Sequence, residues 1–310
     1  MRHRLSWKSP SPGRLLARLC LVVGCLLGAL PTQAADILLT GAEDNPGVQS
    51  FVHALSDMRP ADSVRFQPLA SLPSPGKLPA ATRLILLDLP SLDWRQQEAP
   101  GPATLVLRIS RLQARQRFGV NVPPHLSLLW SDPPLDRQLR LTRLILPQAQ
   151  RIGVLYDKHS EFLLKELRLA ALGLELEVVV ERWDNTHDSR PLQTLLKNCD
   201  VLLGLDDPDL YNPKTAKNLL LSSYSRQLAL IGPNAAFVRA GSLASTYSDQ
   251  SDWLQVLDEL LDLPAASWPR TLYPQHFKVS SNPQVARSLG IEPINEAAVA
   301  TQLAEGKALP

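Results

Sequence analysis

The sequence has almost no cysteine outside its first residues. Of three cysteines, Cys20 and Cys25 lie in the apolar N-terminal stretch, and only Cys199 lies in the body of the chain. A single cysteine cannot form an internal disulfide, so the fold must be held by its core. Cys199 stands just before an apolar run, which is typical of a small buried hydrophobic residue.

The chain also lacks a marked excess of either charge. The formal net charge is +2, but the first 34 residues carry five basic residues and no acidic one. The remainder has 27 basic residues against 30 acidic ones, a net charge of −3. A mildly acidic body without a dense basic patch predicts no nucleic-acid partner.

Several motifs that carry chemistry are missing. The sequence contains no G-x-G-x-x-G, no G-x-x-x-x-G-K-[ST], no G-x-S-x-G and no H-E-x-x-H. No nucleophile–base pair can be read, so we expect no enzymatic activity and no cofactor. The histidines of the body are scattered, and none has metal spacing to another ligand; they are His53, His125, His159, His187 and His276. The spacing therefore predicts no metal site.

The N-terminus is typical of a secretory signal. A basic segment leads into "LCLVVGCLLGAL", and "PTQAAD" follows with small residues before a cleavage point after Ala34. We therefore expect residues 1–34 to be removed and the protein to be periplasmic. Two alternatives stay open: a retained membrane anchor, and a lipid-modified Cys25 in "VVGC".

Beyond the signal, short apolar runs alternate with helical patterns in two successive series. Continuous apolar runs, such as "RLILLDL" and "RIGVLYD", indicate strands covered on both faces of a parallel sheet. The sequence thus predicts an α/β fold of two Rossmann-like lobes. The first lobe would span residues 35–130 and be completed by a returning segment near 236–275. The second would span 131–235 and be completed by 276–310.

Polar residues follow many of these expected strands. In an open α/β sheet, ligands bind outside the carboxyl ends of the strands. If two lobes face each other, these ends converge on one cleft. The candidate ligand-binding residues are Thr40, Asp132, Tyr156, Asp206, Asp207, Tyr211, Asn234 and Tyr247.

Each candidate has a structural alternative. Asp206, Asp207 and Asp209 with Pro208 make a good turn before a helix, and "SDPP" suits a hinge. Tyr211 and Tyr247 could stack on a ligand ring or pack at the edge of the hydrophobic core. An arginine-rich stretch (Arg108, Arg111, Arg115, Arg117) is typical of a solvated helix face.

Four segments, in order, resemble the substrate-binding proteins of ABC transporters. "LPQAQRIGVLYD" is similar to that family's segment between hinge helix and strand. "DVLLGLDDPDLYNPKTAKNLLLSSYSRQLALIG" resembles its strand, helix and following strand. "AFVRAGSLASTYS" resembles its return, and "FKVSSNPQVARSLGIEPI" its closing V-N-x-x-x-A-x-x-L-G-I motif. The resemblance runs from about residue 126 to 294.

The resemblance implies a type I periplasmic-binding-protein fold: two Rossmann-like lobes joined by three crossover strands, with a ligand trapped by hinge closure. Some members bind aromatic amino acids and deliver them to a membrane permease. Two family features differ here. "SDPPLDRQ" stands where the family has a P-G-G-N-V-T-G-like turn after the hinge. The family's G-x-D-Y segment after the return strand is represented only by "TYSD".

The first functional expectation is an exported solute-binding protein that serves an ABC permease. It would close on a small molecule, with Asp206 or Asp207 pairing with a ligand ammonium group. The alternative is a periplasmic sensory or docking component with a degenerate cleft, partnering a histidine kinase or an outer-membrane receptor.

Overall fold

The computed structural model describes residues 34–306, so the expected signal and its cleavage site, apart from Ala34, lie outside the described residues. The first of two sheets is wholly parallel and has the order β11-β5-β4-β3-β1-β2. Its strands are β1 (Asp36–Gly41), β2 (Ser63–Pro68), β3 (Arg83–Leu86), β4 (Thr104–Ile109), β5 (Leu126–Trp130) and β11 (Thr271–Leu272).

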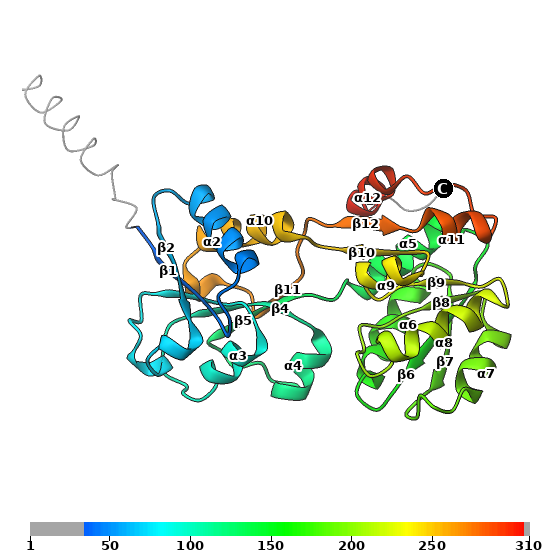
Figure 1. The fold of residues 1–310 in the computed structure, drawn as a ribbon, viewed down its shortest axis with the longest axis horizontal. Coiled ribbons are helices and arrows are strands. Elements are labelled where there is room, and N and C mark those ends of the chain that lie inside the picture. The colour runs from blue at the N-terminus through cyan, green and yellow to red at the C-terminus, as the bar shows by residue number, and fades with distance from the viewer. Residues whose placement is uncertain (1–33, 307–310) are drawn as a thin grey trace, which may run out of the picture. The chain divides into compact units, whose positions relative to one another are not determined.

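The second sheet has the order β12-β10-β9-β8-β6-β7, and only β12 runs antiparallel to its neighbour among the described strands. Its strands are β6 (Arg151–Tyr156), β7 (Glu177–Arg182), β8 (Val201–Leu203), β9 (Ala229–Ile231), β10 (Ala244–Tyr247) and β12 (Lys278–Ser281). The predicted fold class, two largely parallel sheets with interleaved helices, is confirmed (Figure 1).

Helices follow the strands in both lobes. In the first lobe these are α2 (Pro46–Met58), α3 (Leu89–Arg95), α4 (Arg111–Phe118) and α10 (Gln250–Leu261). In the second they are α5 (Leu135–Ile145), α6 (Leu164–Leu172), α7 (Arg190–Asn198), α8 (Pro213–Tyr224), α9 (Ala235–Ala240), α11 (Pro283–Ser288) and α12 (Glu296–Ala304). None of the helices within residues 34–306 is long and apolar enough to cross a membrane.

Strand β3 is shorter than its apolar run. The sequence predicts a strand through Leu89, but the strand ends at Leu86 and α3 begins at Leu89. The Asp88 carboxylate accepts a hydrogen bond from the Ser91 backbone N–H at 2.9 Å, and proline occupies the first turn. Both are strong helix-start signals, so capping overrides the apolar pattern here.

The chain passes between the sheets after β5, after β10 and after β11. The sequence assigns all of 236–275 to the first lobe. In the structure, β10 instead pairs with β9 and β12 in the second sheet. The return begins only after Tyr247, with α10 and then β11 joining the first lobe.

Strand β6 packs very closely against the loop before β8. A methyl group on Gly153 would lie 2.6 Å from Cys199 Sγ and 3.1 Å from Leu195 Cγ. Cys199 is buried, and burial raises the pKa of its thiol to about 11, so it is an inert packing residue as expected.

We expect Gly153→Ala to lower the free energy of unfolding by about 1–3 kcal/mol, because the added methyl overpacks the core. Gly173→Ala is the control. Gly173 has helical backbone angles, and its nearest new contact would be 3.7 Å away. The control should be neutral or stabilise by about 0.4–1 kcal/mol. Urea unfolding measures both; equal effects would contradict the packing described.

Candidate functional site

Two predicted residues, Asp132 and Asp206, meet where the lobes adjoin. Asp132 follows β5, and Asp206 follows β8; both line one small pocket with Arg111 of α4. The cavity has a volume of about 10 Å³, room for a single water molecule. Asp132 is 8% exposed, and its Oδ1 accepts a hydrogen bond from the Arg111 backbone N–H at 2.9 Å.

The electrostatics of this pocket favour protonated carboxyls. Burial, and next the negative charge of Asp206, raise the pKa of Asp132 to about 7, although the Arg111 backbone N–H opposes this. Burial also raises the pKa of Asp206, opposed by the side-chain amide of Asn234, which donates to Asp206 Oδ1 at 3.4 Å. A cation placed beside these two carboxyls would favour their ionised form and so lower both pKa values.

The side chain of Gln138 connects α5 to the second sheet near this pocket. Its side-chain amide donates to the Gly232 carbonyl at 3.0 Å and to Ser245 Oγ at 3.2 Å. Its side-chain carbonyl accepts from the Thr246 backbone N–H and hydroxyl. Gln138 is buried, so this network holds α5 rigidly against β9 and β10.

A second group of acids lies at the ends of β6 and β8. Asp207 is 1% exposed, and its Oδ1 accepts a hydrogen bond from the Asp209 backbone N–H at 3.0 Å. Burial raises the pKa of Asp207 to about 6, and the nearby charge of Asp157 adds to the rise, while the adjacent Ser160 side chain opposes it. Asp207 is thus grouped with Asp157 and Ser160.

The remaining predicted residues have different surroundings. Asn234 donates to Asp206, as described above, and also caps α9 by accepting from the Phe237 backbone N–H. Tyr211 is 7% exposed and packs edge-on against Phe237 in the core of the second lobe, so it edges the core as the structural alternative had it. Tyr156 packs partly buried against the other core of that lobe, and Tyr247 is partly exposed where the chain leaves β10. Thr40 is fully buried at the end of β1, and its hydroxyl has no hydrogen-bond partner.

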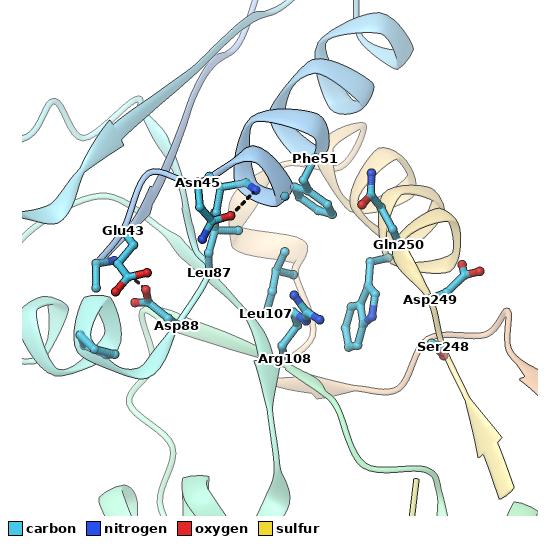
Figure 2. A pocket seen from close by; sticks show the side chains of 15 residues that line it. Glu43, Asn45, Phe51, Leu87, Asp88, Leu107, Arg108, Ser248, Asp249 and Gln250 are labelled. Carbon is cyan, nitrogen blue, oxygen red and sulfur yellow. Dashed lines mark hydrogen bonds between the residues drawn. The ribbon is translucent and has the colours of Figure 1, made fainter. Parts of the chain in front are cut away.

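A second cavity, called here the first-lobe pocket, lies at the strand ends of the first lobe, and none of the eight predicted residues lines it. Its volume is about 510 Å³, within the usual range for small-molecule pockets. Charged, polar and aromatic side chains contributed by β4, α2, α10 and the loops after β1 and β3 surround it (Figure 2). They include Glu43, Phe51, Asp88, Arg108 and Trp253.

Arg108 is unusual in backbone and partners. It has a φ of +58°, at a register shift between β4 and β5, and it lines the first-lobe pocket. Among residues 34–306 its guanidinium has no hydrogen bond or ion pair. Left-handed backbone at a non-glycine residue costs energy and clusters at functional sites. Arg108 is exposed to solvent as the sequence predicts, but it lies on β4 rather than on a helix face, at a register shift that residue patterns do not reveal.

Two other arginines of that stretch connect the lobes. The Arg111 guanidinium on α4 donates to the Glu166 carboxylate on α6 at 2.5 and 2.8 Å. The guanidinium carbons of Arg111 and Arg115 lie 6.0 and 5.3 Å from the ring centre of Phe162. These contacts, called here the Arg111 latch, link the first and second lobes beside the Asp132 pocket.

Comparison with known proteins supports the fold. No protein-family model matches the chain, and no curated protein matches it. A ligand-free, open substrate-binding protein with adhesive properties from Clostridium difficile has a TM-score of 0.64 and 15% identity, covering 84% of this chain and 97% of its own. A Streptococcus pneumonia ABC domain in complex with L-Trp has a TM-score of 0.55 and 15% identity, covering 86% and 98%.

A conserved domain protein from Vibrio cholerae is similar, with a TM-score of 0.56 and 15% identity over 86% of this chain and 98% of its own. These likenesses extend over most of both chains. They confirm, at the level of the fold, the resemblance to substrate-binding proteins that the sequence motifs predict.

The raised pKa of Asp132 predicts a pH-dependent stability. The folded state holds a proton that the unfolded carboxyl releases near pH 4, so stability falls as the pH rises from about 4 through 7. The slope contributed by this group is at most about 1.4 kcal/mol per pH unit. Asp132→Asn should remove that contribution.

Chemical denaturation at several pH values between 5 and 8 measures this. Asp44→Asn, at an exposed carboxylate that accepts a hydrogen bond from the Gln49 side chain, is the control and should leave the slope unchanged. An Asp132→Asn chain with the parent's slope would show that Asp132 is ionised like a surface carboxyl.

Proposed function

We propose that the chain is the exported binding component of an ABC-type uptake system, and that it captures a small solute bearing an ammonium group between its lobes. The observation that carries the proposal is the meeting of Asp132 and Asp206 from opposite sides of the hinge region in a two-lobe binding-protein fold. Two buried carboxylates repel one another when both are ionised, and a cation between them removes that cost.

The first-lobe pocket supports the same proposal. It offers room for a small molecule, aromatic surface from Phe51 and Trp253, and the unpaired guanidinium of Arg108. An arginine of this kind suits a carboxylate. The pneumococcal neighbour holds L-Trp, a molecule that carries both an ammonium and a carboxylate group.

The second candidate function is a periplasmic sensory or docking component. Two observations favour it. The Asp132 pocket has a small volume, and the contacts of the Arg111 latch link the two lobes directly. In this case the cleft is degenerate, and the partner is a histidine kinase or an outer-membrane receptor. Neither function requires a catalytic group, and we propose that the protein is not an enzyme.

A thermal-shift screen against amino acids, amines, nucleosides and sugars separates the two functions. Capture predicts that one class stabilises the chain, by about 2.7 kcal/mol at a hundred times Kd. Asp206→Asn should then weaken binding of that class about 10- to 150-fold, the loss of one charge-assisted hydrogen bond.

Asp184→Asn is the control for this loss. Asp184 is exposed just after β7 and pairs with Arg182, so its variant should bind as the parent does. A folded chain that no class stabilises would favour the sensory function. If the Asp206→Asn variant bound the solute with unchanged affinity, Asp206 would not be part of the binding site.

Export gives a separate prediction. We expect the full-length chain expressed in a Gram-negative host to appear in the periplasmic fraction with Ala35 as its first residue. N-terminal sequencing and intact mass measure this. A chain that retains residues 1–34, or one that carries a lipid on Cys25, would contradict cleavage after Ala34.

A further inference from the structure

The ends of β6 and β8 bring together side chains that spacing along the sequence keeps apart. Asp157 and His159 follow β6, and Asp209 follows β8, some fifty residues later. One ligand atom from each lies within 4.8 Å of the others. The sequence predicts no metal site because these residues do not share a helix face or a short motif; the parallel pairing of the second sheet joins them.

Local hydrogen bonds orient two of these ligands. Asp157 Oδ1 accepts from the His159 backbone N–H at 2.7 Å and from the Ser160 backbone N–H at 3.0 Å. These bonds fix the turn after β6 and set the Asp157 carboxylate beside His159. Such turns are common without any ion, so this geometry alone does not indicate a site.

Asp207 supplies an independent observation. It is 1% exposed, and its Oδ2 is buried with no hydrogen-bond partner in the structure. Its other oxygen accepts from the Asp209 backbone N–H, and its carboxyl interacts with Asp157 and Ser160. An uncompensated buried carboxylate oxygen is costly, and it faces the same group of acids. A cation held there offsets that cost.

We propose that Asp157, His159 and Asp209, supported by Asp207, bind a divalent first-row transition-metal ion such as Zn²⁺. An imidazole nitrogen with carboxylate oxygens suits zinc or manganese better than calcium or magnesium, which take oxygen ligands alone. Donors bound at about 2.0–2.1 Å to one tetrahedral zinc ion lie about 3.4 Å apart. The three ligand atoms lie within 4.8 Å of one another, so each side chain must shift by less than about 1 Å to bind one ion.

The site is open to solvent and belongs to one lobe. Asp157 is buried, His159 is partly buried and Asp209 is exposed, so the ion can be reached from outside. All four residues lie in the second lobe, and binding does not depend on closure of the lobes. The site therefore goes beyond the proposed capture of an ammonium-bearing solute and stands independently of it.

The test uses the tag-free chain, stripped of metal with a chelator, because a polyhistidine tag would itself bind zinc. Isothermal titration with Zn²⁺ should give one ion per chain at micromolar or tighter Kd, and Mg²⁺ at the same concentration should give no heat. We expect His159→Ala and Asp209→Asn each to weaken Zn²⁺ binding about 10- to 100-fold, and Asp207→Asn about 10-fold.

His187→Ala is the matched control, since His187 is an exposed loop histidine of the same lobe. It should bind Zn²⁺ as the parent does. Circular dichroism confirms that each variant is folded, and anomalous diffraction from a zinc-soaked crystal places the ion. A folded parent that binds no Zn²⁺, or His159→Ala and Asp209→Asn variants that bind it unchanged, would overturn the proposal. The solute screen, run with chelator present, is unaffected by either outcome.

Discussion

A strand buried on both faces tolerates few polar side chains until it ends. Strands β1 and β6 obey this constraint: each is apolar and buried along nearly its whole length, and polar groups follow at the carboxyl end. Because the strands of each sheet run parallel, apart from β12, these ends lie on one edge. The polar chemistry of both lobes is therefore concentrated where a ligand can reach it.

Concentrating acids has an electrostatic cost. Asp132 with Asp206, and Asp157 with Asp207, are close enough for one charge to raise the pKa of the other residue. The Arg111 latch lies beside the first pair, but its guanidinium binds Glu166 rather than these acids. Among the residues that the structure describes, neither acid pair forms an ion pair with a basic side chain, although the charge of Arg111 lowers the pKa of Asp132 somewhat. The two proposals, a solute cation at one pair and a metal ion near the other, follow from this shared feature.

Much of the fold could be predicted from the sequence because it depends on local signals. Continuous apolar runs predict the parallel strands, and Asn45, Ser110 and Asp249 cap helices near where polar residues precede helical patterns. The errors arose where two local signals compete, as at Asp88, or where sheet membership depends on distant pairing, as for β10. Pairing between distant segments is a tertiary property that one sequence does not display.

The site could be predicted only in outline. Parallel strand ends drew attention to Asp132 and Asp206, and the structure places both in one pocket. Residue type could not distinguish Tyr211, which packs in the core, from a ligand-stacking ring. The position of Arg108 at a pocket was not predicted because it depends on a register shift, and the grouping of His159 with Asp209 was not predicted because the two are remote in sequence. Each failure concerns a contact across the fold rather than a pattern along the chain.

The central claim is that the lobes close on a solute held between their strand ends. Pulsed electron paramagnetic resonance tests it directly with spin labels on Val120→Cys and Leu169→Cys, two exposed positions on opposite lobes. Cys199 is buried and has a raised thiol pKa, so it should resist labelling. With the solute that stabilises the chain in the screen, we expect the label distance to shift to a single narrower distribution. A distribution unchanged by saturating solute would contradict closure.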